Sequence, residues 1–380
     1  MHGCLSDKGR MSSAVNVVIH ASQFPEKVRR DLLASLRTRR VNHKFHYDSV
    51  KQTQKWLALH QSCSPARTDA DCAAIYGRGF AAAAARVKSK AVHVIGLGCG
   101  GGQKDTRLLK LLKKTGRKIF YTPCDVSTAM VLTARQTALA ILPEKNCFPF
   151  VCDLTTADDL PRIIWEGRRV GDPNFSGTAA RHPSQEYARL ITFFGMIPNF
   201  EPQIILPKLA SLVRPNDFLL FSANLAPGHN YAAGVKKVLP QYDNPLTRDW
   251  LMTFLLDLGV ERSDGELLFK IETCRSRREE AQTSRSISAK KNQRLLTSSP
   301  AMEEVELKRI VADFHFTRPR RIEVDHERFN FQSGEIIRLF VSFRYTPELV
   351  RKILARFGLA VCDQWITKSE EEGVFLCRRK

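Results

Sequence analysis

One stretch near residue 90 decides the fold class, because a short apolar run passes through a glycine cluster into an amphipathic segment. The apolar run covers 91–96 (AVHVIG), four glycines follow between 98 and 102, and leucines at helical spacing fill 104–114. Glycine lets a backbone turn sharply and lets a ligand approach closely, while the first turn of a helix leaves N–H groups free. The stretch therefore predicts a strand, a ligand-binding turn and a helix.

The same alternation continues to residue 225. Further apolar runs predict strands, and the segments between them predict helices; the strands are expected at 118–125, 148–154, 190–197 and 217–225, and the helices at 127–142, 157–165 and 203–213. Strands that alternate with helices of this length indicate βαβ units and a mainly parallel sheet. We expect a doubly wound α/β core.

The pattern changes after Pro227, where strand-like runs become longer and helices fewer. A helix is predicted at 244–258, strands at 265–273, 308–316, 321–331 and 335–345, then a helix at 347–357 and strands at 359–367 and 373–379. We expect an α+β insertion, with the last helix and an antiparallel strand pair closing the edge of the first sheet. The predicted units are 1–85 (helical part of a substrate domain), 86–229 (core), 230–345 (inserted substrate-binding part) and 346–380 (completion of the core).

The chain carries a formal net charge of +20 over 380 residues, and most of the excess lies in three basic clusters at 27–44, 104–118 and 275–294. Such clusters either bind a polyanion or form solvated helix faces. We favour solvated faces, because no aromatic residues or RNA-binding signature accompany the charge. Nucleic acid is thus a partner that the sequence permits without favouring it.

Several classes of protein are excluded or disfavoured. No apolar stretch is long enough for a membrane span or a signal peptide. The ten cysteines are scattered without a Cys-x-x-Cys pair, which argues against a metal site and a disulfide framework. We expect a cytoplasmic monomer with reduced thiols and no bound metal.

The glycine turn fits neither common phosphate-binding template, since Gln103 breaks the dinucleotide pattern and Asp105 follows Lys104 where a P-loop has Ser or Thr. Asp125 and Asp153 end the next two predicted strands. Carboxylates there suit ribose hydroxyls or an adenine amino group and would repel a phosphate. The alternative is that both residues cap the helices that follow them. We favour a ligand role, because a phosphate-free nucleoside with a positive sulfonium matches the glycines and both acids.

These motifs resemble a known family. The runs VIGLGCGGGQKDTRLL, YTPCDVS, VCDLT, FFGMIPNF, YDNPLTRDW and VSFRYTPE occur in this order. Their order resembles the histidine-specific, S-adenosylmethionine-dependent methyltransferases of ergothioneine biosynthesis, to which fungal dimethylallyltryptophan N-methyltransferases are related. The resemblance covers the chain from about Phe45 onward and implies a class I, Rossmann-like methyltransferase sheet with an inserted α+β substrate-binding domain.

The resemblance assigns the cofactor, S-adenosylmethionine, to one set of residues. Gly98, Gly100 and Lys104 match the family's glycine loop and lysine, with Gly102 in the same loop. The resemblance also assigns the ribose to Asp125 and the adenine side to Asp153, with Leu154 as the apolar neighbour. Gly96 departs from the pattern, because an acid is usual there.

The acceptor residues match the family only in part. Asn199 and Tyr242 match the residues that hold the substrate carboxylate, and Tyr47 matches a tyrosine of the same site, so these three are the expected catalytic positions and bind the acceptor. Ser342 is also retained as a substrate contact. Phe340 replaces the glutamate that binds the imidazole, and Phe194, Pro198 and Cys63 replace two glycines and a tyrosine. Without that glutamate a histidine acceptor would lose a charge-assisted hydrogen bond worth about 1.5–3 kcal/mol.

We therefore predict an S-adenosylmethionine-dependent N-methyltransferase that acts on a small amino-acid-like acceptor with altered side-chain recognition. Two alternatives stay open at this point. The acceptor could be RNA or another macromolecule that docks on the basic surface, or the fold could serve as a non-catalytic binding protein.

Overall fold

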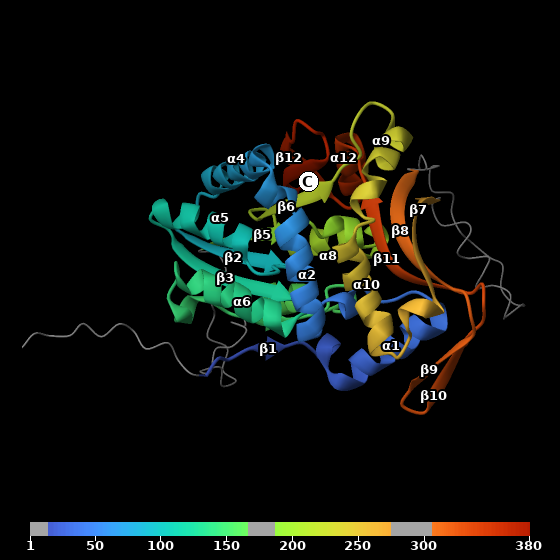
Figure 1. Cartoon of the computed structure of the whole chain (residues 1–380). Coiled ribbons are helices and arrows are strands. Elements are labelled where there is room, and N and C mark those ends of the chain that lie inside the picture. Colours follow the sequence, from blue (N-terminus) through green and yellow to red (C-terminus); the bar gives the residue numbers. More distant parts are fainter. Residues whose placement is uncertain (1–13, 166–186, 275–305) are drawn as a thin grey trace, which may run out of the picture.

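The computed structural model describes residues 14–165, 187–274 and 306–380 (Figure 1). The third basic cluster, at 275–294, lies outside these residues. An eight-stranded sheet in the order β1-β4-β3-β2-β5-β6-β13-β12 forms the centre. Its strands are β1 (Val18–Ile19), β2 (Ala91–Leu97), β3 (Lys118–Asp125), β4 (Phe150–Val151), β5 (Tyr187–Phe193), β6 (Phe218–Asn224), β12 (Leu359–Ile366) and β13 (Glu372–Arg379).

The direction of the strands confirms the predicted doubly wound core. Strands β1 to β6 pair in parallel, and the order reverses at β2, with β3 and β4 on one side and β5 and β6 on the other. Ligands bind at such a reversal, beyond the carboxyl ends of the strands. The C-terminal pair also matches the prediction, because β13 pairs antiparallel with both β6 and β12.

Helices cover both faces of this sheet. One face buries apolar residues of α4 (Ala70–Arg86) and α5 (Gln103–Lys114), beside α6 (Thr128–Leu139). The other face buries α8 (Pro202–Leu212) and α12 (Pro347–Arg356), next to α7 (Leu160–Trp165). Burial on both faces explains why the parallel strands read as continuous apolar runs.

A second layer stands beside the sheet (Figure 1). It contains the antiparallel sheet β11-β8-β7 and the hairpin β9–β10, whose bounds are β7 (Gly265–Cys274), β8 (Leu307–Phe316), β9 (Arg320–Val324), β10 (Glu327–Phe331) and β11 (Ile336–Arg344). Its apolar core includes residues of α1 (Pro25–Thr38) and α10 (Pro245–Asp257), and α2 (Val50–Cys63) packs against α10. The short helix α9 (Tyr231–Val238) packs on β8.

The two layers touch at the carboxyl edge of the main sheet. Leu225, just after β6, forms a bridge with Tyr345, just after β11, and the 3-10 turn η4 (Ile197–Asn199) packs on both β6 and β11. Two pieces of the segment 1–85 contact the main sheet: β1 pairs with β4, and α4 packs on β12 and β13. Helices α1 and α2 of that segment lie with the second layer, while the short helix α3 (Pro65–Thr68) packs against α4 and α2.

The predicted elements differ most from the observed ones at four places, of which the first is the strand expected at 190–197, observed at Tyr187–Phe193. The strand expected at 148–154 is only Phe150–Val151, because Asp153 starts a hydrogen-bonded turn. The helix expected at 157–165 begins at Leu160. The single strand expected at 321–331 is a hairpin that turns at Asp325, whose φ is 55°. Four polar residues at 325–328 interrupt the apolar alternation of 322–331, so the sequence carried a local signal for this turn.

Among the described residues, none of the helices has the length and apolar character needed to cross a membrane.

Candidate active site

A cavity of about 660 Å³ opens at the carboxyl edge of the main sheet, between that edge and the second layer. Most of the residues predicted for the site line it: Tyr47, Gly98, Gly100, Lys104, Asp125, Asp153, Leu154, Asn199, Tyr242 and Phe340. Gly102 and Ser342 were predicted to contact ligands and do not line it. The volume is in the range of small-molecule sites.

The glycine turn has the geometry that its sequence predicted. Gly98, Gly100 and Gly102 all have positive φ, at 57°, 52° and 75°. A Cβ at Gly98 would lie 2.8 Å from Met196, and one at Gly100 would lie 3.2 Å from the ring of Trp56. A Cβ at Gly102 would lie 2.8 Å from Ala134 of α6, which explains its absence from the cavity. The third glycine therefore serves helix packing, and the first two form a cradle that a side chain would fill.

Asp125 joins the end of β3 to this turn. Its carboxylate accepts hydrogen bonds from the backbone N–H of Gly100 at 3.0 Å and of Ser127 at 3.1 Å. Burial raises the pKa of Asp125 above its ordinary value, while these backbone donors oppose the rise. The residue thus stabilises the turn before α6 and also faces the cavity, while the N-cap of α6 itself is Ser127, so the helix-capping alternative does not hold for Asp125.

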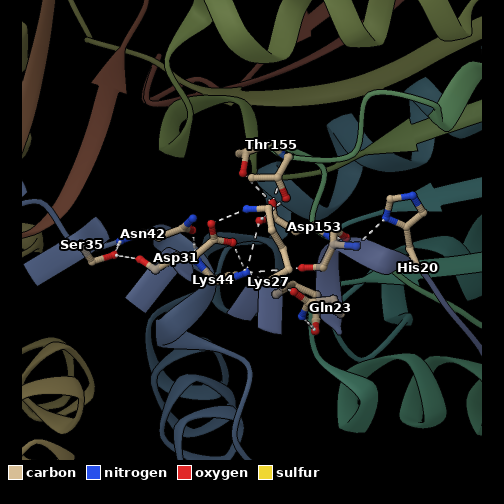
Figure 2. A network of polar contacts seen from close by, with 12 residues as sticks. His20, Gln23, Lys27, Asp31, Ser35, Asn42, Lys44, Asp153 and Thr155 are labelled. Atoms are coloured by element: carbon tan, nitrogen blue, oxygen red, sulfur yellow. Dashed lines mark hydrogen bonds and ion pairs between the residues drawn. The ribbon is translucent and has the colours of Figure 1, made fainter. Parts of the chain in front are cut away.

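Asp153 has more partners than the sequence suggested (Figure 2). Its oxygens accept from Thr155 N and Oγ1 at 2.9 and 2.6 Å and from Thr156 Oγ1 at 3.0 Å. Lys44, which is 2% exposed, places its ammonium 3.8 Å from Asp153 and 2.6 Å from Asp31 of α1. Asp153 therefore caps a turn, whereas α7 begins only at Leu160, so the helix-capping alternative does not hold here; Lys44 ties the second layer to the end of β4.

Gly96 departs from the family pattern for a visible reason. A Cβ at this position would lie 2.1 Å from Oδ2 of Asp105, so a carboxylate from α5 occupies the space beside the strand. Asp105 accepts from Thr192 Oγ1 at 2.7 Å and from Tyr121 Oη at 2.8 Å. Burial raises its pKa to about 6. The acid expected at position 96, at the end of β2, therefore has a counterpart in Asp105 on the next helix, α5.

Lys104 lies in an aromatic setting next to the glycine turn. Its ammonium stands 4.6 Å from the ring centre of Tyr76 and 6.0 Å from that of Phe194. Burial lowers its pKa. Phe194 replaces a family glycine, and here its ring helps to hold the lysine.

Five aromatic rings form a continuous wall from the glycine turn to the second layer: Trp56, Tyr47, Trp250, Phe340 and Tyr242. Successive ring centres are 5.9, 5.4, 5.9 and 6.0 Å apart. Trp56 begins this aromatic wall beside Gly100, and Tyr242 ends it. Desolvation and the nearby Asp125 hold the pKa of Tyr47 well above its usual range, so its hydroxyl stays protonated.

The far end of the aromatic wall carries the polar groups of the acceptor side. Tyr242 Oη and Ser342 Oγ are 2.9 Å apart, and Nη2 of Arg344 donates to Tyr242 Oη at 2.6 Å. Ser342, which is 1% exposed, holds the hydroxyl of Tyr242 and has no face on the cavity. Asn199 lies at the end of η4, which packs on β11 near these groups.

Sequence reasoning missed several residues of this cavity, among them Trp56, Trp250, His43 and Arg344. Desolvation lowers the pKa of His43 to about 3, so its imidazole is neutral, and its Nε2 has no hydrogen-bond partner among the described residues. Trp250 and Arg344 lie directly inside the quoted motifs YDNPLTRDW and VSFRYTPE. Their position in those motifs was the signal that could have identified them.

Comparison with protein families finds one match. The model of the family described as histidine-specific, S-adenosylmethionine-dependent methyltransferases matches residues 28–237 and 300–379. The unmatched segment between them, 238–299, contains α10 and β7 of the second layer. Among curated proteins, none matches the chain.

Solved structures similar to the chain include several methyltransferases. The CcbJ methyltransferase from Streptomyces caelestis is 10% identical over 80% of this chain and 87% of its own, with a TM-score of 0.34. Magnesium protoporphyrin IX methyltransferase (ChlM) from Synechocystis PCC 6803, with bound SAH, is 11% identical over 94% and 100%, with a TM-score of 0.34. The 1,6-didemethyltoxoflavin-N1-methyltransferase of Burkholderia thailandensis, with bound S-adenosylhomocysteine, is 9% identical over 86% and 87%, with a TM-score of 0.37.

The family model spans most of the chain and includes the glycine turn, the aspartates and the end of β11. The sheet order and the cavity at the strand reversal agree with a class I methyltransferase core. This chain belongs to the histidine-specific, S-adenosylmethionine-dependent methyltransferase family.

Proposed function

We propose that the protein methylates the amine of a small amino-acid-like acceptor whose side chain differs from that of histidine. One observation carries the proposal: a single cavity joins the glycine turn and Asp125 at one end to Tyr47, Asn199, Tyr242 and Phe340 at the other. Its volume of about 660 Å³ suits a nucleoside cofactor together with a small acceptor.

The residues at the first end fit S-adenosylmethionine. Gly98 and Gly100 line the cavity and carry no side chain, so a ligand can approach their backbone. Asp125 offers a carboxylate to hydroxyl groups, and Leu154 is an apolar neighbour, 7% exposed. When bound, the cofactor supplies a methyl group on a sulfonium, and transfer to an amine leaves S-adenosylhomocysteine and releases a proton. Asp153 and Lys104 complete this proposed set.

The residues at the second end act on the acceptor. Asn199 and Tyr242 orient it, and the aromatic wall excludes water, which favours the uncharged amine that the reaction needs. Tyr47 stays protonated and serves as a hydrogen-bond group rather than a base. The neutral imidazole of His43 has a free nitrogen that can accept a hydrogen bond from the amine.

The same proposal assigns the main sheet, with residues 86–229 and 346–380, to the cofactor, and the second layer, with 230–345 and the helices before α4, to the acceptor. The layers meet at the cavity, so each contributes one end of it.

The contacts of the basic clusters favour a small acceptor over RNA. In the cluster at 27–44, Arg29 pairs with Asp325, Arg37 with Glu327, and Lys44 with Asp31. In the cluster at 104–118, Lys104 faces the cavity, and Lys113 and Arg117 donate to backbone carbonyls. These charges largely serve internal contacts, which leaves few of them for a phosphate backbone.

The proposal is tested by isothermal titration calorimetry on the full chain. S-adenosylhomocysteine is titrated first, and the common L-amino acids are then titrated into the loaded protein. We expect micromolar binding of the product, followed by uptake of one amino acid in preference to histidine. Uptake of RNA by the loaded protein with no uptake of any amino acid would contradict the proposal.

A further inference from the structure

Arg344, at the end of β11, is a buried cation without an anionic partner. Its side chain is 4% exposed and lines the cavity. Nη1 donates to the carbonyl of Leu225 at 3.1 Å and Nη2 to the hydroxyl of Tyr242 at 2.6 Å, while Nε has no hydrogen-bond partner among the described residues. Within the described part of the chain no carboxylate lies within 4.0 Å of its nitrogens.

The acids that line the same cavity are all bound to other groups. Glu371 accepts from Gln241 Nε2 at 2.8 Å, and Glu372 accepts from Tyr76 Oη at 2.5 Å. Asp69 caps α4, while Asp105, Asp125 and Asp153 have the partners given above. The cavity thus holds a guanidinium whose charge nothing nearby neutralises.

A buried charge of this kind is costly unless an ion of opposite sign approaches it. Arginine binds carboxylates through parallel N–H groups, more strongly than neutral donors do. Neither present partner of Arg344 is charged, so a carboxylate that entered the cavity would supply both the missing charge and a partner for Nε.

The position of Arg344 separates it from the glycine turn. The aromatic wall begins at Trp56 beside Gly100 and ends at Tyr242, whose ring centre lies 5.1 Å from the guanidinium. A different cation, Lys104, stands next to the glycine turn on α5. The two ends of the cavity thus each have a cation, and Arg344 is the one at the acceptor end.

We propose that Arg344 binds a carboxylate of the methyl acceptor, with the hydroxyl of Tyr242 beside it. The acceptor is accordingly an anion or a zwitterion, and a purely cationic or uncharged amine is a poor ligand. This inference rests on the proposed function and deepens it. Phe340, four residues earlier on β11 and 7% exposed, faces the same cavity without a charge, so the acceptor end offers a cation and aromatic surface in place of a carboxylate.

The test compares acids with their amides on full-length protein loaded with S-adenosylhomocysteine. The probes are the amino acid that binds best, its carboxamide, and the pair 3-phenylpropanoate and 3-phenylpropanamide. The variants are Arg344→Gln, which removes the charge, Arg344→Lys, which keeps it, and the matched control Arg351→Gln on the exposed face of α12.

We expect the unaltered protein and Arg351→Gln to bind each acid at least tenfold more tightly than its amide. Arg344→Gln should reduce this preference to twofold or less, and Arg344→Lys should retain part of it. Binding of S-adenosylhomocysteine should change less than twofold in every variant, which also shows that the variants fold.

Two results would overturn the inference. One is an undiminished preference for the acids in Arg344→Gln. The other is a tenfold loss of S-adenosylhomocysteine affinity in that variant, which would assign Arg344 to the carboxylate of the cofactor. If 3-phenylpropanoate shows the expected pattern while no amino acid binds, the carboxylate site is supported and the amino-acid acceptor of the proposed function is wrong.

Discussion

The two ends of the cavity differ in how closely they follow the family. At the cofactor end, the glycine turn and both aspartates lie where the motifs predicted. The family's acid is absent at Gly96, but the carboxylate of Asp105 occupies the space beside it. At the acceptor end, Phe340 replaces an acid and Arg344 is a cation without a counterion. Under the proposed function, this comparison means that the cofactor end keeps the residues of the family, while the acceptor end differs from the family in charge.

The largest expected effect is a loss of S-adenosylhomocysteine affinity when Asp125, at the cofactor end, is replaced. Asp125→Ala removes a carboxylate that faces the cavity and holds Gly100 N–H. We expect a loss of S-adenosylhomocysteine affinity on the order of 100-fold, from two lost hydrogen bonds to a charged group. Calorimetry measures it, with Asp363→Ala, an exposed partner of Arg86, as the control. Unchanged affinity in Asp125→Ala would mean that the cofactor site is misplaced.

The second prediction concerns Asp105, the buried acid beside Gly96. Its folded-state pKa of about 6 exceeds the ordinary value of 3.8, so between these two values the folded state binds more protons than the unfolded state. The free energy of unfolding must therefore fall as pH rises through this window, by up to roughly 3 kcal/mol. Urea unfolding at pH 4 to 7 measures the slope.

Asp105→Asn provides the comparison for this slope, since an amide does not titrate. The variant should lack the contribution of Asp105 to the fall in stability. If both proteins show the same pH dependence of stability, the pKa of Asp105 is not raised by folding. The idea that its buried carboxylate replaces the acid expected at Gly96 would then be wrong.

The third prediction separates two costs in unfolding free energy at the glycine turn, one from backbone strain at positive φ and one from overpacking against a helix. Gly102 and Gly116 have nearly equal φ, at 75° and 73°, but only at Gly102 would a Cβ meet another helix, at 2.8 Å from Ala134. Gly116→Ala should cost about 1 kcal/mol from φ alone, and Gly102→Ala about 1–3 kcal/mol more from overpacking. Equal losses of unfolding free energy would show that α6 moves freely away from the turn.

The smallest expected effect is a change in the affinity for the acceptor when Phe340 is replaced. Phe340→Glu restores the family's acid next to Tyr242 and Trp250. We expect the affinity of the loaded protein for L-histidine to rise about tenfold, from one charge-assisted hydrogen bond. Phe340→Gln has a similar shape without the charge and should show no such gain. A variant that folds, binds S-adenosylhomocysteine and still ignores histidine would show that other residues set the specificity.

The sequence predicted the fold well, because local signals specify it. Glycines and alternating apolar runs act over a few residues, and they correctly placed the parallel core and the closing strand pair. The turn at Asp325 was missed although four polar residues, 325–328, interrupt the apolar alternation there.

The candidate site was less predictable, because its contacts join distant residues. Tyr242 meets Arg344 across 102 positions, and Asp153 meets Lys44 from another layer. Single motifs reveal which residue types are present and not which of them lack a partner. The unpaired charge of Arg344 becomes visible only when the acids of the cavity are assigned to their own donors.

The most direct test of the whole account is methyl transfer itself. The protein is incubated with S-adenosylmethionine carrying a deuterated methyl group and with the L-amino acids, their carboxamides and total RNA in parallel, and products are followed by mass spectrometry. The account predicts a labelled N-methyl amino acid that retains its carboxylate, with little label in the matching amide. Label in RNA, or in the amides as strongly as in the acids, would contradict it.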